Sequence, residues 1–227
     1  MLREIISGNF NIWNIIIGIL ASFAVILLTL HIHEWAHGFI ATKLGDPTPR
    51  YQGRLTLNPF AHIDYIGALA IIFLGVGWAK PVQINPRNFK NPKVGMAITA
   101  LAGPVANILM AAVMMLLSNV AYLLPASLGN IPSYIAFFFT SVAYTNIYLA
   151  VFNLIPVPPF DGSRILNAVL PDRYYFKLMQ YERYSMFIVL IIIATGILDK
   201  PLSFISDLIF NVINFVAVLP FIFLYRG

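Results

Sequence analysis

The sequence contains no cysteine, which excludes disulfide bonds and thiolate ligands for a metal. Charged residues are also scarce: they make up only 10% of the 227 residues, against about a quarter in soluble domains. Hydrophobic residues make up 59%, and several apolar stretches reach the roughly 20 residues that span a bilayer. These features exclude an ordinary soluble protein and predict an integral membrane protein built mainly from helices.

The first apolar stretch runs without interruption into the sequence HIHEWAH at residues 31–37. A cleaved signal peptide would have a shorter apolar core followed by small residues at a cleavage site. We therefore expect a retained transmembrane helix over residues 11–44, whose last turns emerge from the membrane. Gly45 and Pro47 are expected to end it.

Further helices are predicted from apolar runs over residues 94–124, 134–155, 183–198 and 202–224. After the first helix, partial alternation at 48–57 favours short strands, and the short, glycine-containing stretch 65–79 favours a re-entrant segment.

The predicted fold class is thus an all-α polytopic membrane protein, with about five transmembrane helices and a short β or re-entrant segment after the first. We expect a single membrane-embedded domain over residues 1–227. Its core would lie at about 11–170, and additional C-terminal helices would follow at 183–224.

The distribution of basic residues predicts the orientation in the membrane. Of the 14 Lys and Arg residues, seven lie at 43–93, four at 164–183 and one at position 226, while the loop at 125–133 has none. Because basic loops stay cytoplasmic, we expect the N-terminus outside and the C-terminus inside. The net charge of +5 is explained by this topology and gives no reason to expect nucleic-acid binding.

The motif H-E-x-x-H is formed by His33, Glu34 and His37. Two imidazoles four residues apart share one face of a helix and can bind one zinc ion. The glutamate can take a proton from a water molecule whose pKa the metal lowers. A charged residue at the centre of a membrane helix costs about 2.5–3.5 kcal/mol on insertion scales, so we interpret this cluster as functional rather than as helix-packing groups.

A hydrolytic zinc site usually has three protein ligands and one open position. The third ligand here must be a carboxylate or one of His31 and His62, both of which we interpret as structural. Asp161 is the strongest candidate, because it follows the proline-rich end of the third predicted helix and Gly162 permits a tight bend. Capping of the next helix is the alternative role for Asp161.

Taken together, three motifs resemble the site-2 protease family of intramembrane zinc metalloproteases: HEWAH at 33–37, GPVAN at 103–107 and NLIPVPPFDG at 153–162. The stretch GRLTLNPFAHID at 53–64 also looks like the family's segment after the first motif. The resemblance covers about 26–170. It points to the compact branch of the family, without a PDZ-like or nucleotide-sensing domain.

The resemblance implies hydrolysis of peptide bonds in or near transmembrane segments. The substrate would be a single-span or other membrane protein within the lipid bilayer. One Zn²⁺ would be held by His33, His37 and Asp161, with Glu34 as the general base. About ten residues, or roughly 15 Å of helix, separate Glu34 from Lys43, which places the active site within the membrane on the cytoplasmic side.

The resemblance also implies roles for residues outside the zinc ligands. Asn107 would be catalytic by helping to hold the substrate or the oxyanion, and Asn153 would help to shape the site. Gly103 and Pro104 belong to the same motif as Asn107. The alternative for Asn107 is a hydrogen bond between packed helices, and Gly103 could simply allow close helix approach.

Two other functions fit part of the sequence. A membrane metal-ion transporter also places His and Asp residues in the membrane, but it usually carries repeats or polar residues on several helices. The predicted helices at 183–198 and 202–224 are nearly free of them. A catalytically inactive relative would bind membrane segments without cutting them, and the intact HEWAH motif and Asp161 argue against it.

Overall fold

The computed structural model describes residues 12–58, 61, 64–67, 69, 80–171, 173, 189, 191–193 and 195–222. These residues form helices and connecting turns, with no β-strand among them. The elements are α2 (Ile12–Ala24), η1 (Val25–Thr29), α3 (Leu30–Lys43), α4 (Thr48–Tyr51), η3 (Pro86–Asn88), α6 (Pro92–Ala121), η4 (Ala126–Leu128), α7 (Ile131–Asn153), α8 (Asp161–Val169), α11 (Asp199–Val218) and η5 (Leu219–Phe221).

The predicted first helix is confirmed as three consecutive segments, α2, η1 and α3. The middle one is a π-helical stretch of five residues, a feature that often lies beside functional sites. The helix ends where predicted, because Gly45 adopts a φ of 109°, a left-handed conformation that favours glycine.

The strands predicted at 48–57 are wrong. Residues Thr48–Tyr51 form the short helix α4 instead, and residues 52–58 contain no strand. The physical reason is local: Asp46 Oδ1 accepts hydrogen bonds from the backbone N–H and the hydroxyl of Thr48, and Pro49 has the fixed φ that suits a first helical turn. The predicted re-entrant segment at 65–79 lies mostly outside the described residues.

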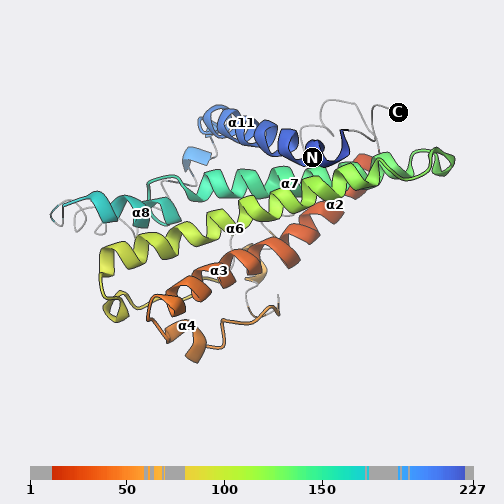
Figure 1. The fold of residues 1–227 in the computed structure, drawn as a ribbon. Helices are drawn as coiled ribbons and strands as arrows, with labels where there is room; N and C mark the ends of the chain where they lie inside the picture. Colours follow the sequence, from red (N-terminus) through yellow and green to blue (C-terminus); the bar gives the residue numbers. More distant parts are fainter. Residues whose placement is uncertain are drawn as a thin grey trace.

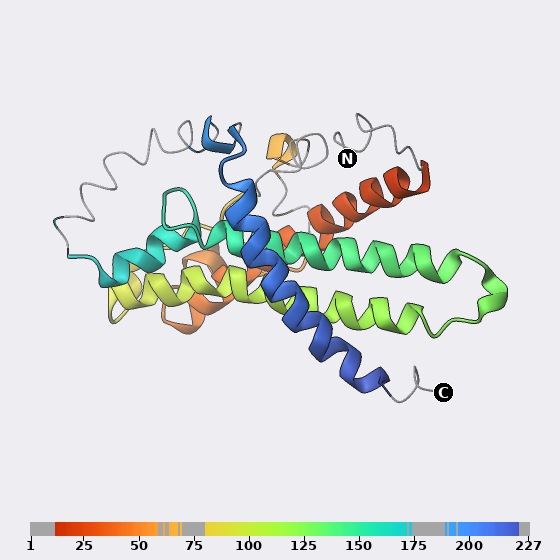
Figure 2. The same cartoon turned by 90° about the horizontal axis from the view of Figure 1, so that it is seen from above.

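The predicted helices at 94–124 and 134–155 are confirmed as α6 and α7, an antiparallel pair at the centre of the molecule (Figure 1). The first helix packs on one side of this pair, and α11 crosses its other side obliquely (Figure 2). The helix α11 corresponds to the prediction at 202–224. The helix predicted at 183–198 lies mostly outside the described residues.

The core lies between the central pair, the first helix and α11, and it is built from small and aliphatic side chains. Ala111 on α6 and Ala143 on α7 have exposed fractions of 0%, so the two backbones approach closely. Large apolar side chains such as Leu109 and Val113 point outward. Four helices of the described residues are long and apolar enough to cross a membrane: Ile15–Lys43, Pro92–Ala121, Ile131–Asn153 and Asp199–Phe221.

Hydrogen bonds between side chains join these helices, including one of 2.9 Å between the hydroxyl groups of Ser118 on α6 and Thr140 on α7. Asn146 on α7 donates to Thr29 Oγ1 on η1 at 3.0 Å, and Tyr144 on α7 donates to Asp207 Oδ1 on α11 at 2.9 Å. The last helix therefore carries a carboxylate within its length and is less apolar than expected.

Candidate metal centre

The two histidines of HEWAH lie on the face of α3 that packs against α6. Both are buried, with exposed fractions of 7% for His33 and 4% for His37. Because they are four residues apart, their rings meet edge to face, with centroids 4.6 Å apart. Their Nε2 atoms are 3.0 Å apart. One turn of one helix thus supplies two adjacent nitrogen atoms that can donate lone pairs to a metal ion, here called donor atoms.

Asp161 brings a third donor atom to the same place. The helix α7 ends at Asn153, a proline-rich turn follows, and α8 begins with Asp161. Asp161 Oδ2 lies 3.2 Å from His33 Nε2 and 3.1 Å from His37 Nε2. The alternative capping role is wrong, because Phe160 occupies the N-cap position and Asp161 is the first helical residue.

Gly162 permits the bend that brings Asp161 inward. A Cβ atom on Gly162 would lie 2.2 Å from the carbonyl oxygen of Leu154, which is backbone and cannot give way. Gly162 does not have a positive φ. Glycine is therefore required here by the close contact of two backbone segments rather than by an unusual backbone angle.

The three donor atoms fit a zinc ion. Their separations of 3.0, 3.1 and 3.2 Å approach the roughly 3.3 Å expected between ligands of a tetrahedral zinc with bonds of about 2.0–2.1 Å. Asp161 Oδ2 is buried and accepts no hydrogen bond within the described part of the chain. Imidazole nitrogens and a carboxylate oxygen are ordinary zinc ligands, and a set of three leaves a fourth position open.

The orientation of His37 is fixed by α6. His37 Nδ1 lies 2.7 Å from the carbonyl oxygen of Thr99. A carbonyl oxygen only accepts hydrogen bonds, so Nδ1 must donate, and the neutral ring then keeps a lone pair on Nε2. This is the arrangement by which proteins commonly orient a metal-binding histidine.

Gly103 lets α6 approach both histidines. A Cβ atom on Gly103 would lie 2.5 Å from His33 Cε1 and 2.5 Å from His37 Nε2, so no larger residue fits without displacing them. Pro104 follows inside the helix and is buried. It has no N–H for the carbonyl of Ala100, four residues earlier in the helix, and the neighbouring Thr99 carbonyl is the one that bonds to His37.

Asn107 lies one turn further along α6, with an exposed fraction of 2%. Its Oδ1 atom has no hydrogen-bond partner within the described residues. Buried polar atoms are nearly always hydrogen-bonded, so this acceptor has bonding capacity for a group outside the described chain.

Glu34 is half-buried, and its Oε2 accepts a hydrogen bond from the backbone N–H of Val82 at 2.8 Å. Val82 belongs to the stretch without helix or strand that precedes η3. No sequence signal marks this contact, because a backbone donor can come from any residue except proline. Every residue also has a backbone carbonyl, so the sequence does not single out Thr99 as the partner of His37. Both contacts were therefore missed.

With this geometry established, comparison with known proteins identifies the family. The family model for Peptidase family M50 matches residues 122–196, which include Asp161. YwhC of Bacillus subtilis is 36% identical over 172 residues, which cover 75% of this chain and 78% of YwhC. The chain belongs to the site-2 protease family, peptidase family M50. The predicted resemblance is confirmed.

More distant relatives of this protease family also match. Rip2 of Mycolicibacterium smegmatis is 26% identical over 182 residues, which cover 77% of this chain and 66% of Rip2. MJ0392 of Methanocaldococcus jannaschii, named a zinc metalloprotease, is 24% identical over 207 residues, covering 90% of this chain and 47% of MJ0392. No solved structure matches significantly. Membership of this family and four apolar helices make the chain an integral, multi-pass membrane protein.

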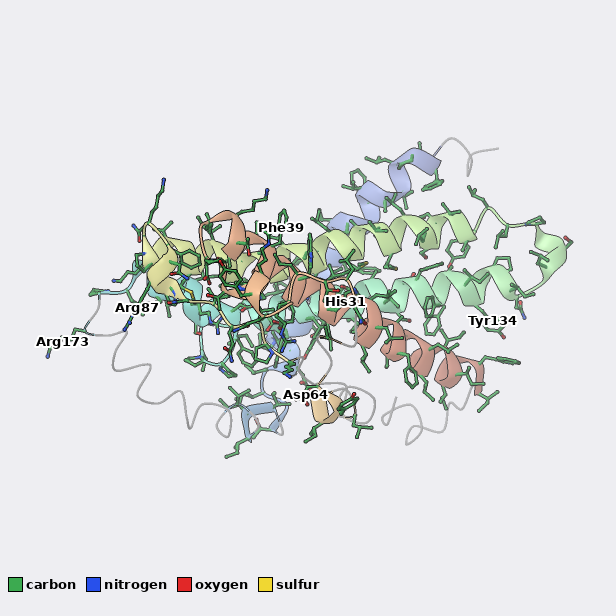
Figure 3. The ribbon with its side chains drawn as sticks, turned by 90° about the horizontal axis from the view of Figure 1, so that it is seen from below. His31, Phe39, Asp64, Arg87, Tyr134 and Arg173 are labelled. Atoms are coloured by element: carbon green, nitrogen blue, oxygen red, sulfur yellow. The ribbon has the colours of Figure 1, made fainter. Side chains whose placement is uncertain are left out.

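Two residues considered from the sequence, Asn153 and His31, remain outside the cluster of donor atoms. Asn153 donates from its side-chain amide to the Leu149 carbonyl within α7, so its role in shaping the protease site stays a prediction. His62 lies outside the described residues. His31 is buried, where the first helix passes the α6–α7 pair (Figure 3).

Proposed function

We propose that this member of the site-2 protease family is a zinc endopeptidase that hydrolyses peptide bonds in or near transmembrane segments of membrane proteins. The observation that carries the proposal is the meeting of His33, His37 and Asp161. Their donor atoms come from two motifs far apart in the sequence and lie within 4.8 Å of one another. Such clusters inside a membrane protein are costly and usually functional.

The three ligands would hold one zinc ion through His33 Nε2, His37 Nε2 and Asp161 Oδ2. When bound, zinc polarises a carbonyl group and lowers the pKa of a water molecule toward neutrality. The donation from His37 Nδ1 to Thr99 keeps the ligand nitrogen of that ring unprotonated.

Glu34 would serve as general base and then as general acid. The Val82 N–H holds its Oε2 atom, which leaves Oε1 to accept a proton from the attacking water. As the water oxygen bonds to the peptide carbon and the C–N bond breaks, Glu34 returns the proton to the leaving nitrogen. Each turnover consumes one water and restores the carboxylate.

Asn107 would bind the substrate. Its buried position one turn beyond Gly103, which touches both histidines, suits an amide that bonds to the backbone of an extended substrate segment. A substrate helix must unwind to reach the site, because its internal hydrogen bonds shield its peptide bonds.

The proposed site lies within the membrane, toward the cytoplasm. His33 and His37 fall inside the apolar span Ile15–Lys43, and His31 lies between Tyr134 and Arg87, which mark opposite ends of the molecule (Figure 3). The N-terminus would be outside and the C-terminus inside. The C-terminal part of this topology requires that the helix predicted at 183–198 also crosses the membrane.

The experiment compares the parental protein with Glu34→Gln in liposomes that contain a single-span substrate. Both proteins should hold about one zinc ion per chain by elemental analysis, while only the parental protein cleaves the substrate. A Glu34→Gln protein that cleaved at the parental rate would refute the base assignment. A parental protein that carried no zinc would refute the proposal as a whole.

A further inference from the structure

Asp46 follows α3 and is completely buried, with an exposed fraction of 0%. Its Oδ1 accepts hydrogen bonds from the Thr48 N–H at 3.1 Å, the Thr48 hydroxyl at 2.6 Å and Asn88 Nδ2 at 2.7 Å. Its Oδ2 accepts from the Asn85 N–H at 2.7 Å. The bonds from Asn85 and Asn88 join the end of α3 to residues 39 and 42 positions later.

These bonds keep the Asp46 carboxylate ionised. Burial alone would raise the pKa of this carboxyl, but the hydrogen bonds from Thr48, Asn88 and Asn85 outweigh burial and hold the pKa below its ordinary value. Removing one of its four donors would leave part of the buried charge unsatisfied, so the arrangement resists displacement. Asp46 is therefore a fixed point beside the end of α3.

Residues 80–88, which we call the strap, connect this fixed point to the metal centre. Near its start the Val82 N–H donates to Glu34 Oε2 at 2.8 Å, and further along Asn85 and Asn88 donate to Asp46. The Val82 side chain is 5% exposed and packs over Gly38 of α3. The strap thus lies along α3 and is held at two points, one of which is Glu34.

We propose that Asp46 is a positioning residue for Glu34. By fixing Asn85 and Asn88, it sets where Val82 lies on α3, so that the Val82 N–H holds one oxygen of Glu34 and presents the other for proton transfer. Val82 and Asn85 are only three residues apart, at most about 10 Å even for a fully extended chain, so movement at Asp46 reaches Glu34. The inference rests on the proposed function, because it takes Glu34 as the base.

The first test is Asp46→Asn, which keeps the shape of the side chain. With its carbonyl oxygen in the Oδ1 position, asparagine keeps the hydrogen bonds from Thr48 and Asn88. Its NH₂ group then faces the Asn85 N–H, so two donors oppose each other and that hydrogen bond is lost. We expect kcat to fall about 10- to 100-fold, with KM within about 3-fold of the parental value. Zinc content should stay parental.

Two control variants test whether the loss of kcat comes from the hydrogen bonds between Asp46 and the strap. Gln83→Ala removes the exposed hydrogen bond from Gln52 to Gln83 on the outer side of the strap, and kcat should stay within about 2-fold of parental. Thr48→Val removes the hydroxyl bond to the same carboxylate without touching the strap, so its loss of kcat should be smaller than that of Asp46→Asn.

The second test asks whether Asp46 acts through the Val82 N–H. Val82→Pro removes this donor, and Val82→Ala keeps it and reports the loss of packing alone. If the proposal is right, adding Asp46→Asn to Val82→Pro lowers kcat by no more than about 2-fold further. If the fold losses in kcat of the two single variants multiply in the double variant, the proposal is overturned. An Asp46→Asn protein with parental kcat would also overturn it.

Amide hydrogen exchange gives a readout that does not depend on cleavage. In Asp46→Asn, a peptide covering the strap should exchange at least about 10-fold faster, while peptides from α6 keep the parental rate. Unchanged exchange in the strap would overturn the anchoring role. A parental protein without zinc or activity would instead contradict the proposed function, and the exchange result would still stand.

Discussion

The two sides of the central α6–α7 pair are built differently. On the side of α3 and α8, buried polar groups converge, and at Gly103 and Gly162 neighbouring groups leave no space for a side chain. On the other side, α11 is more peripheral: 17% of the residues in its most apolar stretch are buried, against 33% for the first helix. Its Asp207 is exposed and is bonded to Tyr144.

This difference indicates where substitutions should disturb the metal centre and where they should not. Around the metal centre, positions are fixed by backbone contacts and by hydrogen bonds of buried groups, so small changes should reach the three donor atoms. On the α11 side, apolar packing and an exposed hydrogen bond hold one helix in place, so changes there should leave the metal centre intact.

The largest effect is expected from replacing a proposed zinc ligand. Asp161→Asn keeps the size of the side chain but removes the charge that faces the two imidazoles, so zinc affinity should fall by more than about 100-fold, beyond the usual cost of losing an outer-shell partner. Competition with a zinc chelator measures this affinity. Asp207→Asn on α11 is the matched control and should keep parental affinity. Equal losses in the two variants would remove the contrast between the two sides.

Gly103→Ala should come next. The added Cβ atom would overlap both imidazoles, so we expect a loss of about 1–3 kcal/mol in unfolding free energy together with weakened zinc binding. Gly18→Ala is the control: a Cβ at Gly18 on α2 meets nothing within 4 Å, so stability should stay level or rise slightly. Denaturant unfolding in detergent measures both. A Gly103→Ala protein with parental stability and zinc affinity would contradict the close contact.

The Asp46 carboxylate should make stability depend on pH. Because its folded pKa lies below the ordinary value of 3.8, its contribution is full above the unfolded pKa and is lost as pH falls through the folded pKa. The parental protein should exceed Asp46→Asn by about 1–2 kcal/mol at pH 7, and the difference should vanish in acid, where protonated Asp resembles Asn. Unfolding measured from pH 7 down to pH 2 checks this, and a constant difference would contradict it.

The smallest effect is expected on the α11 side. Tyr144→Phe removes the hydroxyl that donates to Asp207, at a cost of about 0.6 kcal/mol, the average for a hydrogen bond between membrane helices. Zinc affinity and cleavage should stay parental. A change in zinc affinity would show that α11 is coupled to the metal centre after all.

Much of the fold and site could be predicted because the relevant signals are local. Apolar runs gave the first helix, α6 and α7, and the four-residue spacing of His33 and His37 gave adjacent ligands. Gly45 gave the end of α3. The prediction failed at α4, where hydrogen bonds from Thr48 to Asp46 overrode an alternating pattern.

By itself, the sequence determined that the chain is a helical membrane protein with a paired-histidine motif, since composition and helical periodicity are properties of neighbouring residues. Only the tertiary structure decided that Asp161 meets those histidines, that Thr99 orients His37 and that Val82 and Asp46 hold Glu34 and the strap. These contacts use backbone groups or join distant segments, and such pairings arise only when the chain packs.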